Sequence, residues 1–364
     1  MKIKNVIDFL NEIAPPSLQE GYDNSGLLVG DASRTCTGVI TCLDSTEEVI
    51  DEAIENGCNL IVAHHPILFS GLKRITGKNY IERTIIKAIK HDIAIFAIHT
   101  NLDNVKHGVN GIWASALGLI NQKILSPKND LLQKLVVYVP VNDRDNVLDA
   151  MFIAGAGSIG DYSECSFSSN GEGTFMPLEN ANPYIGEIGK RKIEEECRVE
   201  VLVENFNLSA VVSAMIKAHP YEEVAYDCIK VKKSHREIGS GMIGDLENSV
   251  NVLEWMKELK SVMKCDALKY TNLHKEKVKK IAICGGSGSF LLQDAINSGA
   301  DVFVTSDYKY HQFFDAEGKI IIVDIGHYES EHLTINYLAS IIKEKFTTFA
   351  VLLTKVNTNP INYL

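Results

Sequence analysis

The sequence of 364 residues lacks the patterns that define several classes of protein. It has no run of lysine and arginine and a formal net charge of −11, which argues against a broad nucleic-acid-binding face and leaves only a local positive site open. No apolar run reaches the length that spans a membrane. The eight cysteines form no CxxC pair, so we expect reduced, buried thiols in a cytoplasmic protein rather than disulfides or a cysteine-based zinc site.

The first residues, MKIKNVIDFLNEIAPPS, predict an amphipathic helix that stops at Pro15 and Pro16. The acidic residues of this stretch do not match a signal peptide, which agrees with the cytoplasmic expectation. The chain is 45% hydrophobic, and its length favours a large core divided over more than one domain.

What the sequence does contain is an internal similarity. Residues 38–66 align without a gap with residues 280–308, and both segments read as strand, helix, strand. The following strands are continuous apolar runs, which indicates a mostly parallel sheet covered by helices on both faces. The alternative to a true repeat is that two strand-helix-strand units resemble each other by chance. The expectation of a buried parallel sheet holds under both explanations. The alignment places His64 and His65 opposite Ser306 and Asp307.

A segment of different character separates the two similar parts. Over residues 130–235 we expect a strand, a helix, a polar strand pair around SFSSNGEGTFMP, a further strand, a helix and a strand. Apart from one additional strand, we identify this with the β-α-β-β-α-β order of a ferredoxin-like unit. The predicted fold class is therefore α/β: a three-layer α/β/α core made of two pseudo-repeated halves, residues 1–128 and 238–364, with an inserted α+β ferredoxin-like domain over residues 129–237.

The run IVAHHPILF ends an expected buried strand with His64 and His65. The proline that follows favours an extended conformation, in which successive side chains point to opposite sides. Two imidazoles placed in this way are suited to two different metal ions. In the alternative interpretation, one ring packs against the sheet and the other is solvated. We favour ligation, because two desolvated imidazoles without partners cost free energy.

Polar clusters also follow the next strand of each half. HTNLDN supplies His99 and Asp103, although Asp103 is equally suited to capping a helix. GHYESEH places His327 and Glu331 four residues apart, so on a helix they share a face at a spacing used to hold a metal. A surface helix with an incidental pair remains the alternative.

Taken together, these residues predict a metal site beyond the carboxyl ends of the strands, where ligands bind in α/β sheets. The predicted ligands are His64, His65, Asp103, His327 and Glu331, with Glu331 as the bridge. Such a set suits two divalent ions per subunit, Zn foremost and Fe, Mn, Co or Ni as alternatives. Five ligands for two ions leave coordination positions for water or substrate, as in a catalytic site.

Two other motifs are open to functional interpretation. The glycine-rich ICGGSGSF has a turn that suits an anion at a helix N-terminus, but it lacks the Walker lysine and the full dinucleotide fingerprint, and we favour tight-turn geometry as its explanation. AHPYEEVAYD in the insert reads either as a second polar site or as a capped, solvated turn.

The motifs GYDNSGLLVGD, VAHHPILF, HTNLDN, DVFVTSDYKYH and GHYESE occur in this order, and with them the chain resembles the GTP cyclohydrolase 1 type 2 homologues, also called the Ngg-interacting-factor family. The resemblance covers nearly the whole chain, and the insert resembles the CutA-like, signalling-protein-like domain of the longer bacterial members. Tyr22 stands where the family usually has tryptophan, and Ser306-Asp307 stands where it usually has Gly-Glu. Glu329 and Ser330 also differ from the usual residues.

The resemblance implies a dinuclear metal site on the five ligands above and a toroidal homohexamer, a trimer of dimers. It also implies a metal-dependent hydrolase that opens the guanine imidazole ring of GTP and releases formate. In that reaction His99, or a carboxylate, moves the proton. A small molecule or nucleotide is then the substrate, and no membrane is involved. Such chemistry also needs a clamp for the triphosphate, and the sequence shows no convincing cluster of lysine and arginine for it, although Lys73, Arg74, Lys78 and Lys309 are candidates.

A second hypothesis belongs to a different class. In it the chain is a non-catalytic metal-binding or regulatory protein whose insert senses a ligand or partner. Family membership does not by itself fix function. Metal content measured beside formate release from GTP and related nucleotides distinguishes the two hypotheses.

Overall fold

The computed structural model describes residues 1–364, which form two compact units. One unit combines Met1–Pro127 with Glu237–Leu364, and the other is the intervening Lys128–Arg236. Neither unit has a helix with the length and apolar content that crossing a membrane requires. The protein is a mixed α/β structure with several sheets, which confirms the predicted class at this level.

The first half of the larger unit is a five-stranded sheet in which all neighbours are parallel except β1 and β4. The central strands are buried over their whole length, as their apolar sequences predict. One face packs against α1 and α11, and the other against α2 and α3. Across the sheet, the strands are β1 (Gly26–Val29), β4 (Ala94–Ala97), β3 (Leu60–Ala63), β2 (Gly38–Cys42) and β15 (Ala350–Leu353). The helices are α1 (Ile3–Ile13), α2 (Glu47–Glu55), α3 (Tyr80–Lys90) and α11 (Leu333–Lys345), and a 3-10 turn spans Pro16–Leu18.

The second half is a six-stranded sheet whose centre is again parallel. Helices α5 and α8 cover one face, while α9 and two 3-10 segments, Ser289–Leu291 and Tyr310–Ala316, cover the other. Across the sheet, the strands are β11 (Lys269–Tyr270), β14 (Ile321–Asp324), β13 (Val302–Ser306), β12 (Lys277–Ser287), β10 (Gly239–Asn251) and β5 (Ile120–Pro127). The helices are α5 (Val109–Ala116), α8 (Val252–Val262) and α9 (Leu292–Asn297).

The two halves share a strand register. In the first half β2 pairs with β3 so that Val39 lies opposite Leu60, and in the second half β12 pairs with β13 so that Ile281 lies opposite Val302. These four positions correspond in the gapless alignment of residues 38–66 with residues 280–308. The segments that follow β3 and β13 therefore occupy corresponding places at the carboxyl edges of the two sheets.

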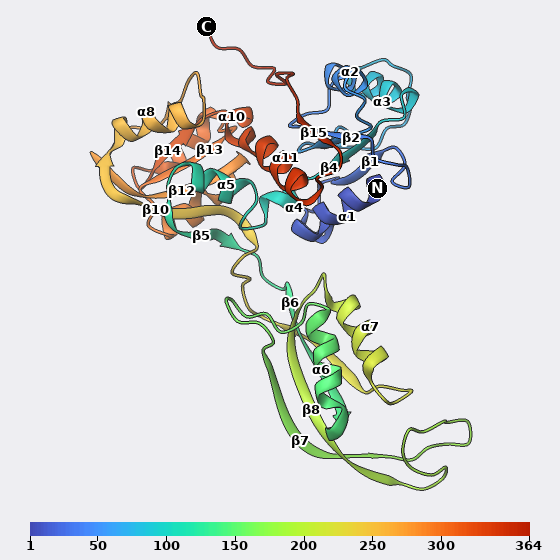
Figure 1. Cartoon of the computed structure of the whole chain (residues 1–364). Helices are drawn as coiled ribbons and strands as arrows, with labels where there is room; N and C mark the ends of the chain where they lie inside the picture. The colour runs from blue at the N-terminus through green and yellow to red at the C-terminus, as the bar shows by residue number, and fades with distance from the viewer. The chain divides into compact units, whose positions relative to one another are not determined.

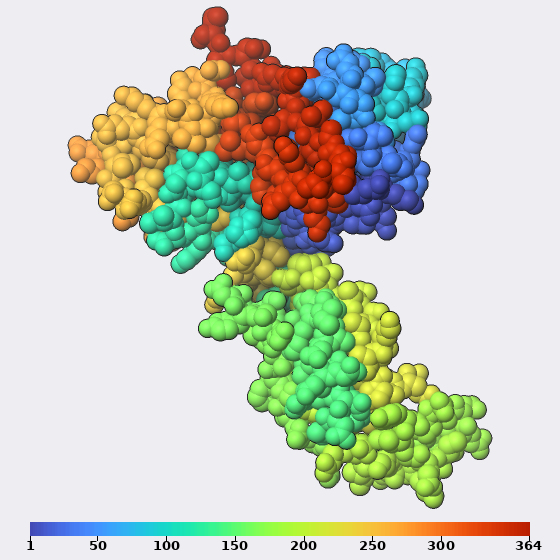
Figure 2. Space-filling view, in the orientation of Figure 1, coloured from blue at the N-terminus to red at the C-terminus, as the bar shows by residue number.

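The C-terminal part of the chain returns to the first half. After α11, strand β15 pairs in parallel with β2, so the edge of the first sheet is built from residues that come last (Figure 1). In the space-filling view the red C-terminal segment lies directly against the blue N-terminal third (Figure 2). The sequence analysis did not predict this return, because the pairing joins segments more than three hundred residues apart.

The smaller unit has the element order β-α-β-β-α-β. Its antiparallel sheet has the order β7-β8-β6-β9, and α6 and α7 pack on one face of it. The elements are β6 (Leu132–Pro140), a 3-10 turn (Val141–Asp143), α6 (Arg144–Ile153), β7 (Ser166–Phe175), β8 (Lys192–Glu204), α7 (Leu208–Ala218) and β9 (Tyr226–Val231).

Two expectations for this unit are refined by the structure. The stretch SFSSNGEGTFMP forms the single strand β7, not a strand pair, because its Asn170-Gly171 turn signal is overridden by continuous pairing with β8. In the AHPYEE segment the ring of His219 is satisfied within a turn. The Nε2–H of buried His219 donates to the carbonyl of Tyr138 at 2.9 Å, and its Nδ1 accepts the backbone N–H of Tyr221.

Candidate metal centre

The predicted site residues lie at the carboxyl ends of neighbouring strands in both halves. His64 and His65 follow β3, and His99 immediately precedes the short helix α4 (Thr100–Asp103) that follows β4. His327 and Glu331 begin and end α10 (His327–Glu331), which follows β14. His65 and Glu331 are 266 positions apart in sequence, but the Nε2 atom of His65 lies 2.8 Å from the Oε2 atom of Glu331. The structure therefore brings the two halves together at this point.

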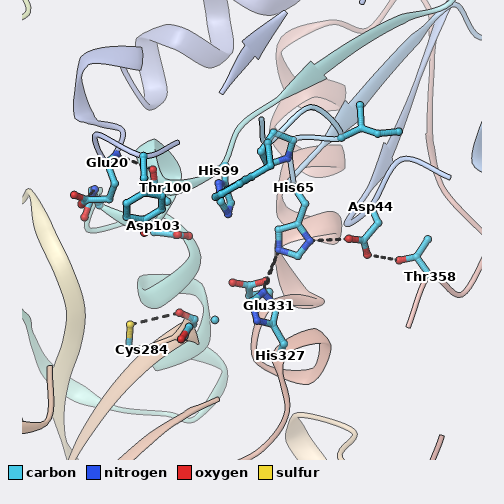
Figure 3. A pocket seen from close by; sticks show the side chains of 18 of the residues that line it. Glu20, Asp44, His65, His99, Thr100, Asp103, Cys284, His327, Glu331 and Thr358 are labelled. Carbon is cyan, nitrogen blue, oxygen red and sulfur yellow. Dashed lines mark hydrogen bonds and ion pairs between the residues drawn. The ribbon is translucent and has the colours of Figure 1, made fainter. Parts of the chain in front are cut away.

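One group of donor atoms surrounds Oε2 of Glu331. The Nε2 atoms of His65 and His327 lie 2.8 and 3.1 Å from this oxygen and 3.3 Å from each other. Figure 3 shows His65 and His327 both directed at the Glu331 carboxylate inside the pocket. Two nitrogens and an oxygen at this separation form a set that can hold a cation.

A second group surrounds the other oxygen of the same carboxylate. The Nε2 atom of His64 lies 3.8 Å from Oε1 of Glu331 and 3.6 Å from Oδ1 of Asp103. The ligand atoms of His64, His65 and His99 also lie within 4.8 Å of one another, so His99 joins the cluster geometrically. The two oxygens of Glu331 thus face two different groups of donors.

Every histidine of the cluster is oriented through its Nδ1 atom. The Nδ1–H of His64 donates to the carbonyl of Ile98 at 2.9 Å, which fixes the proton on Nδ1 because a carbonyl only accepts. The other three donate to carboxylates at 2.7–2.8 Å, in the pairs His65–Asp44, His99–Asp23 and His327–Asp307. Such partners typically orient metal-binding histidines and leave Nε2 free to coordinate.

Two atoms in the centre of the cluster are buried without a hydrogen-bond partner. They are Nε2 of His64 and Oδ1 of Asp103. An unsatisfied buried polar atom costs about 1–3 kcal/mol, and here two of them face each other. A bound divalent cation would satisfy both atoms, so the residues present fit a metal.

The electrostatics of the cluster are dominated by Glu331. Although burial opposes it, the charges of His327 and His65 hold the pKa of Glu331 well below its usual range. Burial likewise opposes protonation of the imidazoles, but the Glu331 charge and the carboxylate hydrogen bonds raise the pKa of His65 to about 10 and that of His327 to about 11. Burial together with the Glu331 charge raises the pKa of Asp103 to about 7. The cluster therefore holds several charged groups close together, and a bound metal ion would change the pKa values of these groups.

The glycine-rich turn of β12 makes room for Glu331. Gly286 has a φ of +62°, and a Cβ atom there would lie 2.5 Å from Oε1 of Glu331. The backbone N–H groups of Gly285, Gly286 and Gly288 donate to the side chains of Asn110, Ser330 and Thr305. These donors are already used within the protein, so tight-turn geometry, rather than anion binding, accounts for the motif.

The cluster opens into a pocket of about 730 Å³. Its wall includes four exposed aromatic side chains, Tyr22, Phe69, Tyr80 and Phe290. None of the predicted triphosphate-holding residues, Lys73, Arg74, Lys78 and Lys309, is among the residues that line it. The cations expected from sequence near HHPILF and DYKYH are therefore directed elsewhere.

Several residues of the site were not predicted from sequence. Asp44 and Asp23 orient histidines from loops far away in the chain, and Thr358 donates to Asp44 at 2.8 Å from the C-terminal segment. Asp23 lies in the motif GYDNSG and Asp307 in DYKYH, so motif membership was the available signal for these two. Nothing in the local sequence marks Thr358.

Comparisons with known proteins show the family of the chain. The sequence model of Duf34/NIF3 (NGG1p interacting factor 3) matches residues 1–360. The chain belongs to the Duf34/NIF3 family. Among curated Duf34/NIF3 relatives, the GTP cyclohydrolase 1 type 2 homolog of Halalkalibacterium halodurans is 41% identical, with 100% of both chains covered. The protein of the same name from Bacillus subtilis is 38% identical over 99% of this chain and 98% of its own length.

Solved structures of Duf34/NIF3 proteins share the fold. A Bacillus cereus protein related to NIF3 matches with a TM-score of 0.89 and 36% identity, covering 100% of this chain and 99% of its own. The Staphylococcus aureus protein SA1388 matches with a TM-score of 0.80 and 32% identity over the same shares. The resemblance inferred from the five sequence motifs is thereby confirmed.

Proposed function

We propose that this Duf34/NIF3 protein is a metal-dependent hydrolase with two divalent ions per subunit. One ion would be held by His65, His327 and Glu331, and the other by His64, Asp103 and Glu331. The observation that carries the proposal is the position of the Glu331 carboxylate, whose Oε2 lies within 3.1 Å of two imidazoles while Oε1 faces His64. A carboxylate placed in this way is suited to bridging two cations.

The donor set favours particular metals. Imidazole nitrogens and carboxylate oxygens without thiolate suit Zn, with Fe, Mn, Co and Ni as alternatives. When bound, such ions supply Lewis acidity, which activates water at neutral pH and polarises the substrate. The protein's own contribution is orientation, because Asp44 and Asp307 fix the two imidazoles that face Oε2 of Glu331.

His99 is the residue we propose to move the proton. It lines the pocket, and its Nδ1–H donates to Asp23 at 2.7 Å. Burial opposes ionisation of Asp23, but hydrogen bonds from His99 and Thr100 lower the pKa of Asp23 to about 2. A permanently charged Asp23 keeps the Nδ1 proton in place, so that Nε2 can accept or deliver a proton in the pocket.

The proposed substrate class comes from the names of the relatives. Curated relatives at 38–41% identity are called GTP cyclohydrolase 1 type 2 homologues, which suggests hydrolytic opening of a cyclic amidine such as the purine imidazole ring. The pocket volume of about 730 Å³ lies within the range of small-molecule sites. The wall of aromatic side chains suits a flat ring.

The proposal extends to assembly and domain organisation. We assign residues 1–128 and 238–364 to a three-layer metal-binding core of two pseudo-repeated halves, and residues 129–237 to an inserted ferredoxin-like, CutA-like domain. The observed β-α-β-β-α-β order supports the assignment of the insert. Cytoplasmic location and a toroidal homohexamer belong to the same proposal, and light scattering on a sizing column tests the hexamer.

A metal-loaded crystal and a turnover assay test the function. Anomalous scattering should show two peaks a few ångströms apart beside Glu331, and the loaded protein should release formate from a purine substrate. His327→Ala should lose metal and turnover together. His311→Ala, an exposed histidine outside the site, should keep both. If His327→Ala lost metal while the fully loaded parent opened no purine compound, the non-catalytic metal-binding function would replace the hydrolase.

A further inference from the structure

The pocket beside the donor cluster has no lysine or arginine in its wall, and its histidines belong to the proposed metal site. Its lining contains neither lysine nor arginine, although the chain has 36 such residues. Enzymes that bind nucleoside triphosphates normally hold the phosphates with Lys or Arg side chains, with a ring of free backbone N–H groups, or with divalent cations. The first of these means is absent here.

The backbone does not replace the missing side chains. The glycine-rich turn that borders the pocket is the natural place for a phosphate cradle, but the N–H groups of Gly285, Gly286 and Gly288 already donate to internal side chains. A phosphate would have to break these hydrogen bonds, two of which involve buried donor groups. These three N–H groups are therefore not free to bind an anion.

The charge of the wall points the same way. Four carboxylates line the pocket, namely Glu20, Asp44, Asp103 and Glu331. Even with two divalent cations in place, this wall offers little surplus positive charge to a triphosphate tail. Like charges brought together in a partly desolvated pocket are a strong means of rejecting a ligand.

The remaining surface suits an aromatic ring. Tyr22 and Phe69 lie side by side with ring centroids 6.3 Å apart, and Phe69 meets the ring of His99 edge-on at 6.3 Å. Both aromatic residues are more than half exposed, so their faces are available to a ligand. A flat heterocycle stacked there would lie next to His99 and the donor atoms.

We propose that the pocket takes an unphosphorylated nitrogen heterocycle, a free base or a nucleoside, and rejects nucleoside triphosphates. The inference rests on the proposed function, because it concerns the substrate of the same metal-bearing pocket. It departs from the substrate that the relatives' name suggests.

Calorimetric titration of the zinc-loaded full chain tests the proposal. Guanosine, GMP, GTP and inorganic triphosphate are titrated separately, and GTP should bind at least about tenfold more weakly than guanosine. Inorganic triphosphate should show no saturable binding. Equal or tighter binding of GTP, binding of inorganic triphosphate, or failure of guanosine to bind would each overturn the inference.

A charge placed in the wall gives an independent check. Phe290 lines the pocket and is 67% exposed, so Phe290→Lys should fold normally and improve GTP binding several-fold relative to guanosine. Phe290→Met, the uncharged control, should leave the ratio unchanged. An unchanged ratio in Phe290→Lys would count against the electrostatic argument.

Formate release measured on the same samples separates the two proposals. Selective binding of guanosine without any ring opening supports the inference about the pocket and contradicts the hydrolase. Ring opening that is faster with GTP than with guanosine supports the hydrolase and overturns the inference.

Discussion

The two halves of the larger unit share a strand register, yet they contribute donor residues to the cluster from different positions. In the first half the strand ends carry His64 and His65, and the loop after β2 carries Asp44, which orients His65. In the second half the position of Asp44 is taken by Gly286, and the positions of the two histidines are taken by Ser306 and Asp307. The donors of the second half come from α10, one strand farther along.

This difference shows how one architecture builds an asymmetric site. Glu331 must reach across from the second half to face both groups of donors, and it can do so because Gly286 leaves the space empty. A carboxylate at position 286, like the one at position 44, would occupy the space that the Glu331 carboxylate takes. The first half therefore supplies two proposed ligands, His64 and His65, directly from the end of β3 and a third, Asp103, from α4. The second half clears the end of β12 for Glu331, a proposed ligand supplied by α10.

Exchanging the residue types at these corresponding positions should have the largest effect on metal retention. In Gly286→Asp the new Cβ collides with Oε1 of Glu331 at 2.5 Å, so we expect metal content to fall to background. Elemental analysis of the purified variant measures this. Gly299→Asp is the matched control, because Gly299 also has a positive φ, +75°, but open space around its Cβ. It should cost about 1 kcal/mol of stability and keep its metal. Equal metal loss in both variants would refute the bridging role of Glu331.

Replacing the carboxylates that orient histidines should have the next largest effect on metal affinity. Asp44→Asn and Asp307→Asn each weaken the orientation of one imidazole near Oε2 of Glu331, so each should lower metal affinity about 10–100-fold. Because both histidines belong to the same group, the loss should concern one ion and leave the ion near His64. Competition with a chelator, followed by metal counting, checks this. A variant that lost both ions at once would show that the two groups are not independent.

Asp23→Asn should separate metal holding from turnover. Asp23 orients His99, which we assign to proton movement, so metal content should stay at the parental level while turnover falls about 10–100-fold. Nitrogen NMR of the His99 ring should also report a changed tautomer. Loss of metal in this variant would instead make His99 a ligand, as its distance to His64 and His65 permits.

A substitution in the C-terminal segment should have the smallest effect on metal affinity. Thr358 donates to Asp44, so Thr358→Val removes one hydrogen bond behind His65, about 1 kcal/mol, and should weaken metal affinity a few-fold. Thr354→Val is the control, because Thr354 donates to Glu52 and holds the same segment away from the cluster. Chelator competition should distinguish the two variants. Identical affinities would show that the segment does not act on the site through Asp44.

Local signals predicted much of this architecture. The apolar runs LIVA and AIFA form β3 and β4, and each is followed by the polar residues that sequence analysis selected. Within each sheet, parallel strands bring their carboxyl ends to one edge, which groups His64, His65 and Asp103 in the first half and His327 and Glu331 in the second. The two groups then meet, with Nε2 of His65 2.8 Å from Oε2 of Glu331. Their role as ligands remains a prediction that metal analysis will decide.

The rest depended on contacts that no local pattern encodes. The pairing of β15 with β2, the hydrogen bond from Thr358 to Asp44 and the exclusion of Lys309 from the pocket wall all depend on distant backbone segments. Long-range pairing is fixed by packing of the complete unit rather than by propensity. The four candidate cations lie outside the pocket wall, because sequence proximity to a motif does not determine where a side chain points.

The return of the chain's last strand to its first sheet has a consequence for biosynthesis. While the ribosome is still making the second half, β2 has an open edge, and His64 and His65 lack the partners that follow more than 260 positions later. At that stage the nascent chain therefore contains only part of the proposed set of metal ligands. Binding at the proposed site would require α10 to have been synthesised, so the supply of metal after that moment would determine which ion is bound.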